Sequence, residues 1–245
     1  MKILRRLCVL AFLFPVCAAW AQTQPSTPSP EDVKAAQSIE QGTALMRAKK
    51  PAEAIPFFEQ AAALYDARAS DRKVRYYSSR TPAETLYYSL QAIATEKDKS
   101  SAVVLSGLWG YSLYLKAYCL VDLGRVGEAK TSLLRAVALA PQNSQFLSEL
   151  GHVYQLEKNW PLAFETFRRA EGAAQEFSPE QVRAADLARA WRGMAYVLVE
   201  LGRLDEAEGL LRKCLQLNSQ DTAAQRELTY VLTQKAKSKG SQTRP

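Results

Sequence analysis

Small and large apolar residues recur along the chain at an interval of about 34 residues. Each copy holds a small residue, a large apolar residue four positions later and a second small residue three positions after that. One copy is Ala129, Leu133, Ala136 with Pro141, and the next is Ala163, Phe167, Ala170 with Gln175. Spacings of three and four place residues on one face of a helix, so the pattern predicts amphipathic helices.

Four copies of a two-helix unit fit this pattern, over about 35–68, 110–143, 144–177 and 188–221. Small residues on facing helices allow close approach, and the large residues fill the space between them. The third copy is the most complete: Leu147, Leu150, Gly151 and Tyr154 on its first helix, then Ala163, Phe167 and Ala170 on its second. The other copies keep the size class where the residue differs, as at Ala117, Ala195, Leu133 and Leu211.

The period and this order of residues resemble the tetratricopeptide repeat (TPR) family. The resemblance spans most of the chain after the N-terminal segment. It implies an all-α fold, a right-handed solenoid of helical hairpins (an α-α superhelix) over 31–237, whose concave groove receives a protein or peptide segment. A final amphipathic helix at 221–237, with Ala224, Leu228 and Val231 on one face, is expected to cap the array.

Turn and capping residues agree with this layout. Gly124 and Gly202 are expected to end first helices in the left-handed conformation. Two segments predict capping boxes with proline at the first helical position, Thr81-Pro82-Ala83-Glu84 and Ser178-Pro179-Glu180-Gln181.

The spacing of the copies departs from the period in two places. The step from Ala163 to Ala207 is longer than one period, which predicts longer helices around Ser178 that project from the stack. The step from Ala54 to Ala129 is longer than two periods, which leaves a degenerate repeat slot at 69–109. A helix is expected at 82–97 in this slot, but the segment DRKVRYYSSR before it has no helical stripe.

The N-terminus predicts a secretory signal peptide at 1–21. A basic start is followed by an apolar run and by the small-x-small pattern Ala19-Trp20-Ala21. The run is short for an uncleaved anchor, the alternative interpretation. Residues 22–30, rich in proline and without charge, are expected to be a disordered linker, and 238–245 a disordered basic tail. The signal favours the periplasm, and secretion is the alternative location.

The net charge of +7 does not indicate a nucleic-acid partner. Three basic residues belong to the signal and four lie at or beyond Lys235, so residues 22–234 hold 25 basic and 25 acidic residues. Neutrality of the folded part argues against a basic binding face.

Catalytic and metal-binding motifs are missing from the sequence. His152 is the single histidine, and no phosphate-binding glycine loop or nucleophile elbow is present. After the signal, Cys119 and Cys214 remain, both at apolar helix positions, where buried free thiols are favoured over a disulfide. We therefore expect no enzyme activity, no metal and no cofactor.

The resemblance places the outward positions of first helices in the groove. These candidate binding residues are Tyr111, Tyr114, Tyr118, Gln145, Ser148, His152, Gln155, Arg189, Arg192, Tyr196, Arg226 and Tyr230. Tyrosine and arginine favour binding because they offer large area and polar tips. The tyrosines at 111–118 also fit an ordinary core stripe, and the arginines also fit solvated helix faces. If the arginines face the groove, an acidic partner segment is expected beside them.

These observations favour a non-catalytic protein-binding adaptor in the cell envelope. An alternative is a subunit of a self-associating or multi-protein assembly that uses the tyrosine-rich 76–118 region as an exposed patch. A hydrolase is a remote alternative.

Overall fold

A computed structural model describes residues 28–71, 73–94 and 101–242. Its elements, in chain order, are α1 (Pro30–Arg47), α2 (Pro51–Arg68), β1 (Arg75–Ser79), α3 (Pro82–Ala94), β2 (Ala102–Ser106), α4 (Leu108–Asp122), α5 (Val126–Leu139), α6 (Ser144–Leu156), α7 (Trp160–Phe177), α8 (Glu180–Glu200), α9 (Leu204–Leu217) and α10 (Thr222–Gln242). The predicted signal peptide at 1–21 and most of the linker lie outside the described residues.

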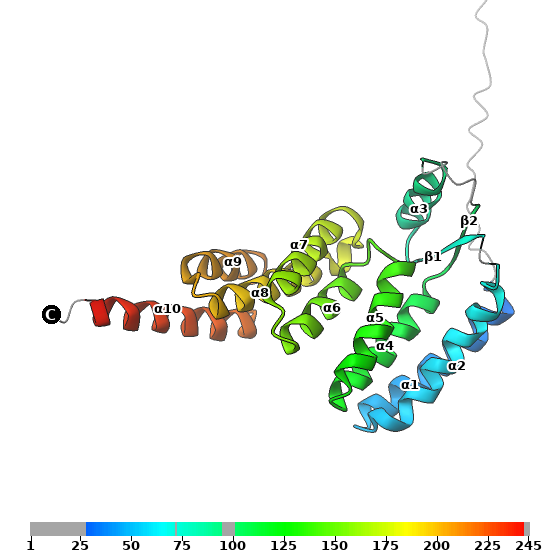
Figure 1. Cartoon of the computed structure of the whole chain (residues 1–245), viewed down its shortest axis with the longest axis horizontal. Coiled ribbons are helices and arrows are strands. Elements are labelled where there is room, and N and C mark those ends of the chain that lie inside the picture. Colours follow the sequence, from blue (N-terminus) through cyan, green and yellow to red (C-terminus); the bar gives the residue numbers. More distant parts are fainter. Residues whose placement is uncertain (1–27, 72, 95–100, 243–245) are drawn as a thin grey trace, which may run out of the picture.

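Helical hairpins stack side by side into an elongated array (Figure 1). The hairpins are α1/α2, α4/α5, α6/α7 and α8/α9, and each packs on the next through its first or second helix. Helix α10 packs on α9 and extends away from the array at the C-terminal end (Figure 1). The predicted all-α TPR solenoid is confirmed.

Small residues set the distance between packed helices, both within a hairpin and between neighbouring hairpins. Ala54, Phe58 and Ala61 of α2 are fully buried. A Cβ on Gly42 of α1 would lie 2.6 Å from the Phe58 ring, and one on Gly193 of α8 would lie 2.2 Å from the Phe167 ring. The Phe58 and Phe167 rings therefore occupy space that only glycine leaves open on the neighbouring first helices.

Each hairpin turns through one residue in the left-handed conformation. Gly124 and Gly202 have φ of +72°, as their sequence context predicted. Lys49 and Lys158 hold the equivalent places with φ of 58° and 55°. In each turn the following N–H donates to a carbonyl near the end of the first helix, as from Arg125 N to Leu120 O at 2.8 Å. This hydrogen bond satisfies a carbonyl at the helix end. At Lys49 and Lys158 it forms although the left-handed conformation of a non-glycine residue costs about 1 kcal/mol.

The helix caps differ from the predicted ones. Thr81 Oγ1 accepts from Glu84 N at 3.1 Å, but the Glu84 carboxylate accepts from Arg80 N and the Arg80 guanidinium and does not close a box on Thr81. Ser178 caps nothing, because its hydroxyl donates to the Asp186 carboxylate at 2.7 Å. A complete capping box lies instead at Ser29 and Asp32 of α1. Residues at the end of the predicted linker thus belong to the start of the fold.

The 69–109 segment is not a degenerate hairpin but a β-α-β unit. Strands β1 and β2 form a two-stranded parallel sheet in the register Arg75↔Ala102 to Ser79↔Ser106, and α3 connects them. Alternation of buried and exposed positions was not visible in so short a strand as RYYSS, and parallel pairing depends on a partner distant in sequence. Helix α2 packs directly on α4, so the insert leaves the stack continuous.

The tyrosine-rich 76–118 region is mostly internal, which corrects the expected exposed patch. Three of its seven tyrosines are buried and three are half-buried, and Tyr118 alone is exposed. Tyr77 stacks on Tyr88 with centroids 4.9 Å apart, and Tyr87 meets the edge of Phe177 at 4.8 Å. Aromatic rings here anchor the insert to the array.

The C-terminal helix continues beyond the predicted boundary at 237. Helix α10 ends at Gln242, so 238–242 is helical and only 243–245 of the expected tail lies outside the described residues. Lys235 forms ion pairs with Asp205 and Glu208 of α9, which holds this part of α10 to the array. No helix within the described ranges is long and apolar enough to cross a lipid bilayer.

Candidate functional site

Two adjoining cavities lie along first helices in the C-terminal half of the array. One, of about 300 Å³, lies between α6, α8 and α10 and includes His152, Gln155 and Arg192. The other, of about 420 Å³, lies between α8 and α10. Both include Tyr196 and Glu227, so they form one continuous depression, which we call the α8–α10 groove.

Two candidate tyrosines form the outer wall of this groove. Tyr196 is 51% exposed and Tyr230 is 54% exposed, although both are large aromatic residues. Tyr196 is tilted against Trp160, with ring centroids 6.3 Å apart. Exposed aromatic rings on either side of a cavity offer contact area that the fold itself does not use.

The candidate residues at the α4–α6 end are packed, in contrast. Tyr114 is buried, stacks on Phe146 and accepts a hydrogen bond from Gln145 Nε2 at 3.0 Å. Burial raises the pKa of Tyr114 to about 12. Tyr111 is half-buried and stacks on Tyr114. These rings join α4 to α6, so the core-stripe interpretation holds for Tyr114 and only Tyr118 is freely exposed.

Ser148 is also removed from the surface. Its side chain is 2% exposed, and its hydroxyl has no hydrogen-bond partner among the described residues. Together with Tyr114 it is unavailable for contact with a partner in this state, which corrects its assignment to the groove lining.

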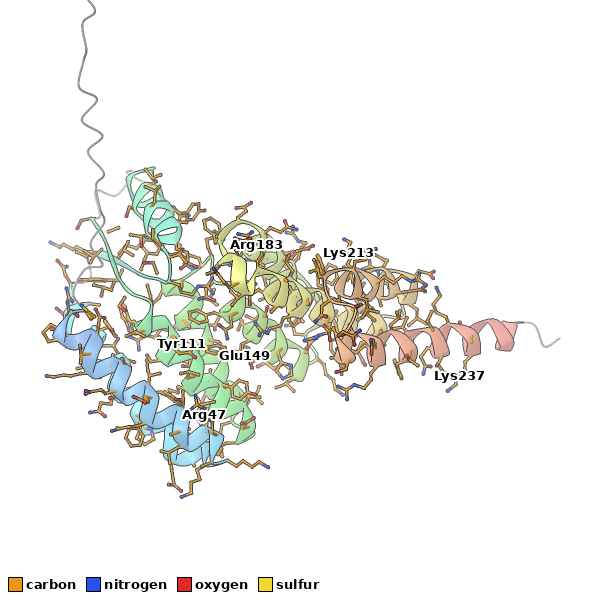
Figure 2. The ribbon with its side chains drawn as sticks, turned by 180° about the vertical axis from the view of Figure 1, so that it is seen from behind. Arg47, Tyr111, Glu149, Arg183, Lys213 and Lys237 are labelled. Carbon is orange, nitrogen blue, oxygen red and sulfur yellow. The ribbon has the colours of Figure 1, made fainter. Side chains whose placement is uncertain are left out.

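Glu149, the residue after Ser148 on α6, is half-buried beside two candidate residues of the groove, His152 and Arg189, which act on its carboxyl. The residue lies four positions after Gln145 and three before His152, so one helix face carries all three. Burial raises the pKa of the Glu149 carboxyl, against the lowering effect of His152 and Arg189. Glu149 is carried by the central part of the array in Figure 2. The spacing from Gln145 and His152 was the sequence signal that could have identified it.

The arginines of α8 are already paired within the protein. Arg189 Nη1 is 3.1 Å from Asp186, and Arg192 Nη1 lies 2.8 and 3.0 Å from the two Asp221 oxygens. Asp221 also accepts from Ala223 N and Ala224 N at the start of α10. Of the three arginines beside which an acidic partner segment was expected, Arg189 and Arg192 thus already have a carboxylate within the chain. Arg226 is exposed and lines the larger cavity.

His152 and Gln155 form the α6 side of the groove. His152 is exposed, with Nδ1 3.3 Å from Gln155 Oε1, and Gln155 Nε2 donates to Gly193 O at 2.9 Å. Gln155 thereby ties α6 to α8 where Gly193 brings the helices close. Within the described ranges, no group of three or more histidine, cysteine, aspartate or glutamate residues could hold a metal ion.

Cys119 and Cys214 are free and buried. Burial raises the pKa of each thiol to about 11. Both thiols are therefore protonated at neutral pH, and neither is an activated nucleophile.

A further cavity of about 600 Å³ lies at the other end, between the insert and α6. It is lined by β2 and by residues that include Arg80, Tyr111 and Gln145. Sequence reasoning missed this cavity because it depends on the β-α-β unit.

The fold is that of a mainly helical repeat protein with an open groove between α6, α8 and α10. Two tetratricopeptide-repeat family models match the chain, over residues 114–179 and 188–231. The chain therefore contains TPR repeats. No curated protein matches its sequence.

Solved structures show the same architecture at low identity. PilF of Pseudomonas aeruginosa is 12% identical, with a TM-score of 0.59 over 85% of this chain and 72% of that one. MamA (residues 41 to the end) from Desulfovibrio magneticus RS-1 is 16% identical, with a TM-score of 0.52 over 83% and 86%. At this identity the likeness concerns the fold.

Proposed function

We propose that this protein is a non-catalytic adaptor of the cell envelope that docks a segment of another protein in the α8–α10 groove. The observation that carries the proposal is the pair of exposed tyrosines, Tyr196 and Tyr230, beside a continuous depression. Neither ring is buried by the fold, and aromatic residues of this kind dominate the energetics of protein interfaces. The TPR fold supports an interaction role.

The signal-peptide pattern of the N-terminal sequence supports the envelope location in this proposal. The basic start, apolar run and small-x-small pattern before Gln22 have the composition of a signal peptide. Fractionation of cells that produce the full-length chain tests the location, because retention in the cytoplasm with an intact N-terminus would contradict it.

Crosslinking and capture from the envelope fraction test the docking. We expect at least one partner to be lost with the double variant Tyr196→Ala/Tyr230→Ala. The control is Leu134→Ala, which removes a comparably exposed side chain (45%) from the second helix α5. If every captured protein survives the double variant, the groove assignment is wrong.

The self-association alternative loses its main support. The tyrosines of 76–118 are largely internal, and the exposed large hydrophobic side chains among the described residues of that region are Leu86, Leu90, Val103 and Tyr118. Nothing in the described part of the chain covers these residues, and they do not by themselves identify a second copy as the partner.

A further inference from the structure

The larger cavity of the α8–α10 groove has an unusual lining for a protein surface. Its inner wall is apolar and consists of Ala195, Val199, Leu211 and Val231. Its rim holds the two exposed tyrosines, Tyr196 and Tyr230. Its polar residues are two carboxylates, Glu200 and Glu227, and one guanidinium, Arg226.

The carboxylate of Glu227 is the most informative group in this lining. It accepts no hydrogen bond from any side chain or backbone group of the described residues, while Glu227 is shared by both cavities of the groove. Burial raises the pKa of Glu227, although Arg192 and Arg226 act in the opposite direction. An ionised carboxylate that is partly desolvated without a partner is destabilised, so binding of a cation would relieve this cost.

Neighbouring cations of the chain do not fill this role. The Arg192 guanidinium is held by both oxygens of Asp221, which in turn is fixed by the backbone N–H groups at the start of α10. Arg226 is exposed and makes no hydrogen bond or ion pair within the described ranges. Lys235 of the same helix is engaged by Asp205 and Glu208.

We propose that the cavity between α8 and α10 is a pocket for a lysine or arginine side chain of the docked segment. Glu227, with Glu200 at the opposite side, supplies the negative charge. The faces of Tyr196 and Tyr230 attract the cation, and the apolar wall accommodates its methylene stem. The inference rests on the proposed docking function and adds the chemical class of the partner.

The proposal reverses the charge that the sequence suggested. Three arginines favoured an acidic partner, but two of them are neutralised by Asp186 and Asp221. An acidic side chain in the cavity would approach Glu227 and Glu200 and could pair only with Arg226. A cationic side chain meets two carboxylates and two aromatic rings, so the lining complements a positive charge.

Single amino-acid probes test the pocket without knowledge of the natural partner. The probes are Nα-acetyl-lysine amide and Nα-acetyl-arginine amide, with the glutamine and glutamate amides as neutral and acidic references. Titration of ¹⁵N-labelled protein, followed by NMR, measures them. We expect the two cationic probes to shift the amide signals of Tyr196, Glu227 and Tyr230, and the two references to leave them unchanged.

Variants of the two charged residues separate the interpretations. Glu227→Gln keeps the shape, removes the charge and is expected to weaken cation binding about tenfold, the size of one hydrogen bond to a charged group. Glu165→Gln, at an exposed position of α7 outside the groove, is the matched control that should leave binding unchanged. Arg226→Gln removes a positive charge from the pocket and is expected to tighten cation binding. Tyr230→Ala, at an exposed position, tests the aromatic part without a risk to the fold.

The outcomes decide the proposal. Any of three results would overturn it. The cationic probes could bind the wild type and Glu227→Gln with equal affinity, the glutamate amide could bind more strongly than they do, or neither cation could bind. Failure of the docking function has a different signature, because then no captured partner depends on Tyr196 and Tyr230.

A partner whose capture needs both tyrosines but is unaffected by Glu227→Gln leaves the docking proposal intact and refutes the cation pocket. A concentration-dependent dimer that Glu227→Gln abolishes would identify a basic residue of a second copy as the occupant and support the pocket.

Discussion

The α4–α6 end and the α8–α10 end of the array both carry tyrosines that were predicted to line the groove. Most of these rings are packed at the first end, and both are exposed at the second. At the α4–α6 end, Tyr111 and Tyr114 stack with each other, and Tyr114 also stacks on Phe146. At the α8–α10 end, Tyr196 and Tyr230 project from the surface beside a cavity. Both sets lie at outward positions of first helices or of the cap, so the repeat pattern alone does not distinguish them. What differs is whether the next helix offers a ring and an amide to complete the packing.

This difference shows that contacts with other residues of the chain decide whether a side chain is free to contact a ligand. Gln145 of α6 donates to Tyr114, and Phe146 stacks on it. Helix α10 instead places one carboxylate, Glu227, and one arginine, Arg226, in the cavity beside Tyr196. The same holds for charges, because Asp221 occupies Arg192 while Glu227 keeps no hydrogen-bond partner among the described residues. A binding face is therefore defined by what its neighbours leave unsatisfied.

The largest effect is expected for Tyr114, compared with Tyr230 at the other end. Tyr114→Ala should lower the free energy of unfolding by about 3–5 kcal/mol, because it empties a buried site between α4 and α6. Tyr230→Ala should change it by no more than about 0.5 kcal/mol. Denaturant unfolding measures both. Similar losses for the two variants would show that the ends do not differ.

An intermediate effect is expected for Arg192. Arg192→Gln should destabilise the fold by about 1–3 kcal/mol, because Asp221 is only 12% exposed and loses its charged partner. Arg168→Gln is the matched control, since the Arg168–Glu165 pair is exposed and should give no measurable change. Chemical denaturation compares them. If Arg192→Gln leaves the free energy of unfolding unchanged, the pair with Asp221 contributes nothing and the guanidinium is free for a ligand.

The smallest effect is expected for Glu149 and depends on pH. Burial raises the pKa of this carboxyl in the folded state, so the folded protein holds the proton more tightly than the unfolded chain. Stability is therefore lost as the pH rises from the usual glutamate pKa of about 4.3 through the raised value, and the loss is complete above it. Glu149→Gln should raise the Tm at pH 7, and the gain should vanish below about pH 4.

Thermal unfolding over a pH series measures this effect, with the exposed Glu165→Gln as the control that should show no such gain. The groups around Glu149 are His152, Arg189 and Asp122. A lower Tm of Glu149→Gln at pH 7 would contradict the prediction and would show that Arg189 stabilises the ionised carboxylate more than burial destabilises it.

The repeats could be predicted from the sequence because their cause is local. Phe167 of α7 faces Gly151 of α6 in the same hairpin, so size and spacing within a single repeat already carry much of the information. The left-handed turns were predicted where glycine marks them, at Gly124 and Gly202, and missed at Lys49 and Lys158. There the tertiary closure of the turn overrides the preference of the residue.

The β-α-β insert and the charged groups of the groove could not be predicted in the same way. Strand β1 depends on β2, which follows only after the whole of α3, and neither strand has a pattern of its own. Asp221, which occupies Arg192, is 29 residues away in sequence. The availability of a side chain is a property of contacts between repeats, and a pattern that describes one repeat at a time does not contain it.

The direct packing of α2 on α4 has a consequence for how the molecule opens. Trp109 of α4 stacks on Tyr65 and donates to Asp66 Oδ1 at 2.9 Å, so the first hairpin is joined to the rest without the β-α-β unit between them. Folding of the first hairpin can then be coupled to folding of α4 and the later helices even when the insert is locally unfolded. We expect the amide hydrogens of β1, α3 and β2 to exchange with solvent through a local opening, at a lower free energy than those of α4 and α6. The solenoid would thus carry an appendage whose folding equilibrium is largely its own.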